Sequence, residues 1–146
     1  MAIWFGTPTI EALRSRAPAG LAAHLGIEFT ALGDDFLRGT MPVLPRVHQP
    51  MGVLHGGASV ALAETLGSVG AYLTVDPQKK RCLGQEINAN HLRPVTEGIV
   101  TGTARPFHIG ARSQVWSIEI RDERERLVCV SRLTVAVVEW KSQERD

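Results

Sequence analysis

Three polar side chains and a pair of glycines lie close together between Gln49 and Glu64. The chain runs there from a Pro/Gly-containing loop through His55-Gly56-Gly57 into a strongly apolar segment. Glu64 is the one charged residue between Gly56 and Val75, and a carboxylate is costly to bury unless something stabilises it. A carboxylate near the free N–H groups of a helix start has the parts needed to bind and attack a polarised carbonyl.

The loop and the helix start offer two donors to a carbonyl oxygen. The Gly56 N–H would point out of the helix start, where the helix dipole assists it, and a glycine lets a ligand approach the backbone closely. The alternative is that Gly56-Gly57 is only a tight turn. Gln49 precedes Pro50 and is biased to extended backbone; its amide could bind the same carbonyl, or it could be a surface loop residue.

Glu64 and Ser68 share one face of the predicted helix, because they are one turn apart. Glu64 could be a general base or a nucleophile, and the alternative is a structural carboxylate that caps a neighbouring chain or pairs with an arginine. Ser68 could hold a water against the carboxylate, or it could be a small packing residue. The sequence leaves these alternatives open.

The spacing of Gly56 and Glu64 limits how they can act together. Eight residues of helix span about 12 Å, so one substrate carbonyl cannot touch both on the same helix. If both serve one reaction, two protomers must each supply part of the site. The chemistry therefore predicts an obligate dimer.

Composition excludes several function classes. The chain has 146 residues, enough for one domain with a real core. Its 16 Lys+Arg balance 15 Asp+Glu, and the scattered arginines and few aromatics predict no nucleic-acid partner. We expect neither a signal peptide nor a membrane span. Cys82 and Cys129 are predicted to be free thiols, which is typical of a cytoplasmic protein.

Motif spacing also argues against cofactor chemistry. The five histidines form no His-x-x-x-His pair and the cysteines do not cluster, so we expect no metal. The sequence has no phosphate loop, no Gly-x-Gly-x-x-Gly after a strand and no Gly-x-Ser-x-Gly elbow. We therefore predict a reaction without a cofactor and without a Ser-His-Asp triad.

Hydrophobic periodicity predicts the elements that must position these residues. Two short helices are expected, Thr9 to Arg16, capped by Thr9 and ended by Pro18, and Leu21 to Leu25, stopped by Gly26. A long helix, apolar or small nearly all round, is expected over 57–75 and should be enclosed. Strands are expected at 27–32, 36–43, 82–93, 98–108, 113–121 and 127–138.

The order of two strands, one long helix and four strands predicts an α+β domain, an antiparallel sheet wrapped around one long central helix. We expect one domain over residues 1–146, with a charged C-terminal tail at 139–146.

The run from Gln49 to Glu64 resembles the hotdog-fold acyl-CoA thioesterases of the 4-hydroxybenzoyl-CoA and phenylacetate-pathway type. It is most similar to the enterobactin-proofreading and 1,4-dihydroxy-2-naphthoyl-CoA thioesterases, which share the patterns Glu86 to His91, Gly110…Arg112 and Gln114-Val115-Trp116. The resemblance covers about Ile10 to Val138.

The resemblance implies a hotdog fold and roles for particular residues. Glu64 would be the nucleophile or general base, and the Gly56 N–H would bind the thioester oxygen. Gln49 and His55 would orient the thioester, and Ser68 would help to position water. The acyl-CoA would be bound at a subunit interface of a homotetramer, a dimer of dimers, lined by Gly84, His91, Leu92, Arg93, Pro94, His108, Ile109, Gly110, Ala111, Arg112 and Ser113.

Within that set, Arg93 and Arg112 are the expected phosphate partners, with solvated strand-end charges as the alternative. Pro94 replaces the small polar residue expected there. The sequence as a whole predicts a cytoplasmic hydrolase of an aryl- or medium-chain acyl-CoA. The rivals are a non-catalytic acyl-CoA-binding protein of the same fold and a hotdog dehydratase or hydratase.

Overall fold

The computed structural model describes residues 1–16 and 19–140. Every predicted helix and strand occurs, with ends within three residues of those expected. A short 3₁₀ helix, η1, adds to them inside the Pro-rich loop. The elements are α1 (Ile10–Ser15), α2 (Gly20–Leu25), β1 (Glu28–Leu32), β2 (Leu37–Pro42), η1 (Pro45–Val47), α3 (Gly56–Leu73), β3 (Lys80–His91), β4 (Ile99–Ile109), β5 (Ser113–Arg121) and β6 (Leu127–Glu139).

Two expectations lie outside the described residues. These are the role of Pro18 in ending the first helix and the charged tail beyond Trp140. The other helix ends follow local signals. Thr9 caps α1 by accepting a hydrogen bond from the Ala12 N–H, and Gly26 ends α2 in a left-handed conformation with φ 70°.

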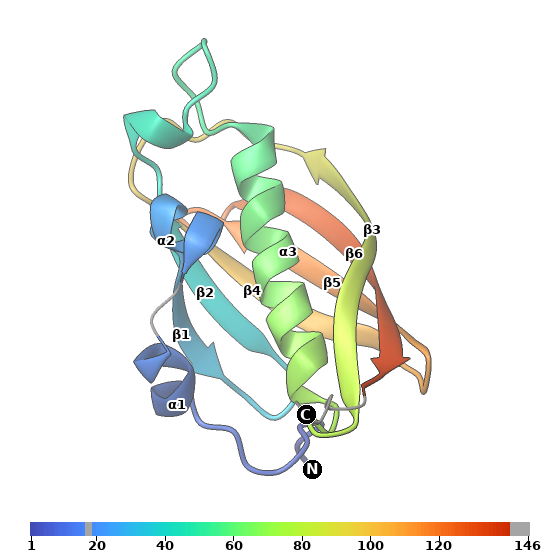
Figure 1. Ribbon diagram of the computed structural model, residues 1–146. Coiled ribbons are helices and arrows are strands. Elements are labelled where there is room, and N and C mark those ends of the chain that lie inside the picture. The colour runs from blue at the N-terminus through green and yellow to red at the C-terminus, as the bar shows by residue number, and fades with distance from the viewer. Residues whose placement is uncertain (17–18, 141–146) are drawn as a thin grey trace.

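The six strands form one sheet in the order β1-β2-β4-β5-β6-β3, and every neighbouring pair is antiparallel. The sheet curves behind α3, which runs across its concave face (Figure 1). This arrangement confirms the predicted α+β hotdog fold. It leaves β1 and β3 as the two edge strands, and β3 is much the longer of them.

The core lies between α3 and the sheet. Alternate residues of the central strands point toward the helix, and fully buried helix residues meet them. Gly67 and Gly70 bring α3 close, because a Cβ there would overlap Leu133 and Trp116. The largest buried side chains of this interface are Leu62, Leu66, Val100, Trp116, Ile118, Ile120, Leu133 and Val135.

The prediction that α3 is enclosed on all sides is wrong for a single chain. Its sheet-facing side is buried, but Val60, Ala61, Thr65, Val69 and Tyr72 are only half-buried. One flank of the helix therefore presents small and apolar side chains that this chain does not cover. The apolar and small residues of α3 extend almost all round the helix, but the sheet of one chain covers only one side of it.

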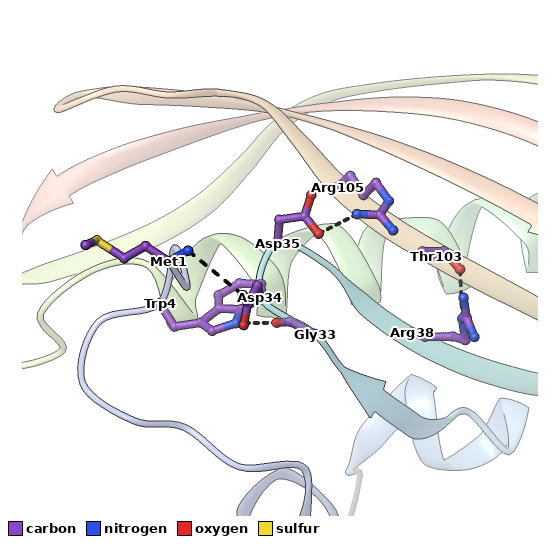
Figure 2. Close-up of polar contacts among 8 residues, drawn as sticks. All are labelled: Met1, Trp4, Gly33, Asp34, Asp35, Arg38, Thr103 and Arg105. Atoms are coloured by element: carbon purple, nitrogen blue, oxygen red, sulfur yellow. Dashed lines mark hydrogen bonds and ion pairs between the residues drawn. The ribbon is translucent and has the colours of Figure 1, made fainter.

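The N-terminal segment packs under the far end of α3. The indole N–H of Trp4 donates to the Gly33 carbonyl at 2.7 Å, and the Met1 amino group lies 3.9 Å from the Asp34 carboxylate (Figure 2). The Phe5 N–H donates to the Leu73 carbonyl at 2.8 Å. The same close-up shows Arg105 paired with Asp35, which ties β4 to the β1–β2 turn.

A buried polar network joins this segment to the core. Gln114 is fully buried; its amide nitrogen donates to Thr74 Oγ1 at 2.8 Å, and its oxygen accepts from the Trp116 indole at 2.9 Å. Trp4 stacks on Trp116 with ring centroids 6.3 Å apart. A satisfied buried amide favours one arrangement of the α3 terminus against the sheet.

Within residues 1–16 and 19–140, no helix combines the length and the apolar character needed to cross a membrane.

Candidate active site

The start of α3 is capped by His55. Its Nδ1 accepts a hydrogen bond from the Gly57 N–H at 2.8 Å, so Nδ1 carries no proton and Nε2 of the neutral ring carries one. The N–H groups of Ala58 and Ser59 both reach the His55 carbonyl. Among the described residues, the Gly56 N–H has no acceptor. One backbone donor at the positive end of the helix dipole is therefore available to a ligand.

A cavity of about 320 Å³ lies beside Gly56. It brings together several residues that the sequence predicts for the site, from the loop before α3, from the start of α3 and from the segment after β3. Its lining consists of Gln49, Val53, Leu54, Gly56, Ser59, His91, Leu92, Arg93, Pro94 and Val128. We call Gln49, Gly56 and His91 to Pro94 the Gly56 cluster.

The Gln49 side chain is held by its own loop. Its Oε1 accepts a hydrogen bond from the Met51 N–H, and its backbone N–H donates to the Val53 carbonyl at 2.9 Å. Because Oε1 faces a donor, the amide NH₂ is the end left for a ligand. Gln49 and Gly56 thus each offer an N–H to the same cavity.

His91 lies across the start of the helix. A Cβ built on Gly56 would come within 2.7 Å of His91 Nε2, so a larger residue there would have to push the imidazole aside. His91 is exposed on its other side and lines the cavity. The place of His91 beside the substrate, like its role, stays a prediction.

Glu64 lies away from this cavity, two turns further along α3. Its Oε1 accepts a hydrogen bond from Ser68 Oγ at 3.2 Å, which brings together the two residues that the helix periodicity pairs. The carboxylate rests on the backbone of β3 at Gly84. Glu64 is half-buried and lies about 12 Å from Gly56 along the helix.

The remaining predicted residues, 108–113, lie at the end of β4, in the turn that follows and at the start of β5. The Gly110 N–H donates to the Ser113 carbonyl, and the Val137 N–H to the Arg112 carbonyl, each at 2.9 Å. Ser113 pairs with Ala136, which pairs with Leu83, so this turn lies near Gly84. We call Glu64, Ser68, Gly84 and residues 108–113 the Glu64 cluster.

One chain does not bring the two clusters together. Arg93 follows the His91 end of β3, whereas Arg112 lies near the Lys80 end. β3, which separates these two ends, spans roughly 35 Å at its usual rise per residue. The two predicted phosphate partners therefore cannot bind one diphosphate from the same protomer.

The cysteines are poor alternatives as nucleophiles. Burial raises the pKa of the Cys129 thiol, and burial raises that of Cys82 against an opposing effect of Lys80. A thiol with a raised pKa holds little of the thiolate that attacks carbonyls at neutral pH. Within the described residues, no three His, Cys, Asp or Glu side chains gather as a metal site would need.

Two features of the site escaped the sequence analysis. Ser59 lines the cavity while almost fully buried; its position three residues after Gly56 places it on the same helix face, which is a usable signal. The contact of the Glu64 carboxylate with Gly84 depends on the pairing of β3 with β6, and no local sequence pattern indicates this contact.

Known proteins resemble this chain over most of its length. The family model described as the thioesterase superfamily matches residues 51–129. A proofreading thioesterase of Cronobacter turicensis is 53% identical over 93% of this chain and 98% of its own. A 1,4-dihydroxy-2-naphthoyl-CoA hydrolase of Escherichia coli is 51% identical over 93% of this chain and 99% of its own.

Solved structures give the same picture. A thioesterase from Haemophilus influenzae superposes with a TM-score of 0.91, at 48% identity, over 98% of this chain and 99% of that chain. Its likeness therefore includes both the sheet and the central helix.

Proposed function

Because the chain belongs to the thioesterase superfamily and is a thioester hydrolase, we propose that it hydrolyses acyl-CoA to a free acid and CoA at sites shared between two protomers. The observation that carries this proposal is the separation of the two clusters on one chain. Each cluster holds half of the required chemistry, and neither half is sufficient alone.

The Gly56 cluster binds the thioester carbonyl. The free Gly56 N–H and the Gln49 NH₂ donate to the carbonyl oxygen, and these interactions strengthen as negative charge develops on that oxygen in the transition state. His55 holds the helix start in place and turns its Nε2–H outward. Fixed donors of this kind lose little energy in reorganisation during the reaction.

The Glu64 cluster supplies the attacking group. Glu64 acts as the nucleophile or as the base that takes a proton from water, and Ser68 positions the carboxylate and the water. In either route a C–O bond forms at the acyl carbon, the C–S bond breaks, and CoA leaves as the thiol after gaining a proton. If water attacks, the free acid is formed directly; if Glu64 attacks, water then cleaves the resulting anhydride, which releases the acid and restores the carboxylate. One carboxylate and two donors suffice for a thioester, so the proposed reaction uses no cofactor.

The open edge of β3 is the proposed dimer contact. Two β3 strands paired antiparallel around a two-fold axis would place the His91 end of one beside the Lys80 end of the other. The Gly56 cluster of one protomer would then meet the Glu64 cluster of its partner. The uncovered flank of α3 would be buried by the same contact.

CoA recognition is proposed to involve both protomers. Arg93 at the cavity of one protomer and Arg112 of the second would bind the phosphates. The acyl group is proposed to be aryl or medium-chain, and an Escherichia coli relative is named for an aryl-CoA. A cytoplasmic homotetramer, formed as a dimer of dimers, completes the proposal; the two free cysteines are consistent with a reducing compartment.

A complementation experiment tests the shared site. Chains carrying Glu64→Gln are co-expressed with chains carrying Gln49→Ala, and thiol release is measured with an aryl- and alkyl-CoA panel. Half of the randomly mixed dimers are hybrids, and each hybrid has one site free of both changes. We expect the mixture to reach about a quarter of wild-type activity, well above either parent.

The matched control combines Glu64→Gln with Ser68→Ala, two changes in one cluster. No hybrid of that pair has an unaltered site, so no recovery is expected. Recovery confined to the first mixture supports the shared site. Equal failure of both mixtures contradicts it, and wild-type protein that binds acyl-CoA without releasing thiol would favour the non-catalytic rival.

A further inference from the structure

The carboxylate of Glu64 occupies the space that a side chain at Gly84 would need. A Cβ built on Gly84 would overlap Glu64 Oε1 and lie 3.2 Å from the carboxyl carbon and 3.7 Å from Oε2. All three of its near neighbours belong to Glu64. The conflict is therefore with the carboxylate itself and not with the rest of the helix.

The backbone of β3 is irregular at this same point. Gly84 pairs with Val135 and Glu86 pairs with Thr134, so Gln85 is an extra residue in a β-bulge. Bulges bend a strand locally and re-aim the groups beside them. Here the bulge follows the residue on which the carboxylate rests, and it lies on the free edge of the sheet.

We propose that Gly84 is a positioning residue, and that its missing side chain fixes where the Glu64 carboxylate lies. This inference rests on the proposed function of Glu64. Glu64 is held from one side by the Ser68 hydroxyl and bounded on the other by the backbone of β3 at Gly84. The sequence resemblance implied only that Gly84 lines the substrate path.

A displaced carboxylate should slow the reaction more than it weakens binding. Gly84 has no atoms beyond its backbone to contact substrate, and the Gly56 cluster that binds the carbonyl lies elsewhere on the chain. A misplacement of about 1 Å in a reacting group can cost up to 100-fold in rate. The expected signature is a lower kcat at nearly constant KM.

The test adds a methyl group at position 84 and, in a second variant, shortens the Glu64 side chain to make room for it. Gly84→Ala should lower kcat for an acyl-CoA by roughly 10- to 100-fold and change KM less than about threefold. Glu64→Asp shortens the side chain by about 1.5 Å and makes room for that methyl. Adding Gly84→Ala to Glu64→Asp should therefore change kcat by less than about threefold, a strong non-additivity.

Gly102→Ala is the matched control. A Cβ there would press on Leu66 and Leu62 of the same helix from another strand, without touching Glu64. We expect Gly102→Ala to lower the melting temperature. We expect the effects of Gly102→Ala and Glu64→Asp on kcat to add in the double variant, because shortening Glu64 makes no room near Gly102. Oligomeric mass is measured for every variant, so that loss of assembly is distinguished from displacement.

The outcomes separate this inference from the proposed function. Near-normal kcat in Gly84→Ala, with Glu64→Gln inactive, overturns the positioning role and leaves the function intact. Near-normal kcat in Glu64→Gln overturns the proposed function of Glu64 as nucleophile or base. If Gly84→Ala fails to fold, the double variant decides: folding with the kcat of Glu64→Asp supports the inference, and failure of both contradicts it.

Discussion

The side chain of Glu64 is the residue on which the proposed reaction depends most. Glu64→Gln keeps the shape of the side chain but can neither attack nor accept a proton, so kcat should fall by about 100-fold or more with the fold retained. Steady-state thiol release and circular dichroism measure this. Glu119→Gln, a surface carboxylate paired with Arg121, is the control and should keep kcat. A Glu64→Gln enzyme with normal turnover would contradict the assignment.

His55 has two roles that substitution can separate. Asparagine is a good N-cap, so His55→Asn should keep the cap on Gly57 while removing the Nε2–H donor. We expect a melting temperature close to that of the wild type and a clearly lower kcat. His55→Ala removes both and should also cost about 1 kcal/mol of stability. Equal kcat in His55→Asn and wild type would restrict His55 to helix capping.

Arg93 is expected to act on the phosphates of CoA. Arg93→Ala should raise KM for acyl-CoA by about 3- to 10-fold and leave kcat nearly unchanged, because the phosphates are far from the reacting carbon. An acyl-pantetheine lacks those phosphates and should be insensitive. Arg105→Ala, an exposed arginine paired with Asp35, serves as the control. Equal losses on both substrates would instead indicate a structural role.

Among the elements, those with local signals could be predicted closely. Thr9 and Gly26 mark helix ends by capping and turn chemistry, and the structure places α1 and α2 accordingly. The start of β3 was missed by two residues, because Lys80 and Arg81 are strand only through their pairing with Glu139 and Val138. Such pairing between distant strands cannot be predicted from the residues next to Lys80 and Arg81 alone.

The turn between β5 and β6 depends on one carboxylate. Asp122 Oδ1 accepts from the N–H groups of Arg124 and Arg126, and Oδ2 pairs with the Arg126 guanidinium at 2.7 Å. The hydrogen bond from the Arg126 side chain, more than any other contact, lowers the pKa of Asp122 below its ordinary value of 3.8.

A lowered carboxyl pKa makes the stability of this turn depend on pH in a definite direction. The contribution is present above the ordinary pKa and is lost as pH falls through the lower, folded-state value. Asp122→Asn should therefore be less stable than wild type at pH 7, and the difference should shrink toward pH 3. Urea midpoints at pH 7, 5 and 3 measure this, and a difference that is constant with pH would contradict it.

At the scale of the whole molecule, the sequence could predict that the site is divided. The spacing of Gly56 and Glu64 requires this for any helix. It could not predict that residues 108–113 lie with Glu64 while His91 to Pro94 lie with Gly56, because that division follows from the strand order. The contact of Glu64 with Gly84 could not be predicted either, because it also follows from how the strands pair.

A shared site makes activity depend on protein concentration. Dilution of the wild-type enzyme should lower its specific activity in step with the loss of dimer, because a lone chain keeps the outer ends of the two clusters roughly 35 Å apart. Activity and mass distribution are measured on the same dilution series. A monomer with undiminished turnover would contradict the shared site, and added acyl-CoA should shift the dissociation to lower concentrations.

The place of β3 in the sheet also orders events during synthesis. β3 is complete at His91, yet β6, its partner among the residues that the structure describes, begins only at Leu127. At roughly 5–20 residues per second, the ribosome needs a few seconds to supply it. During that time no neighbouring strand holds Gly84, on which the Glu64 carboxylate rests, in place. We therefore expect the nascent chain to be inactive until β6 has emerged and paired with β3.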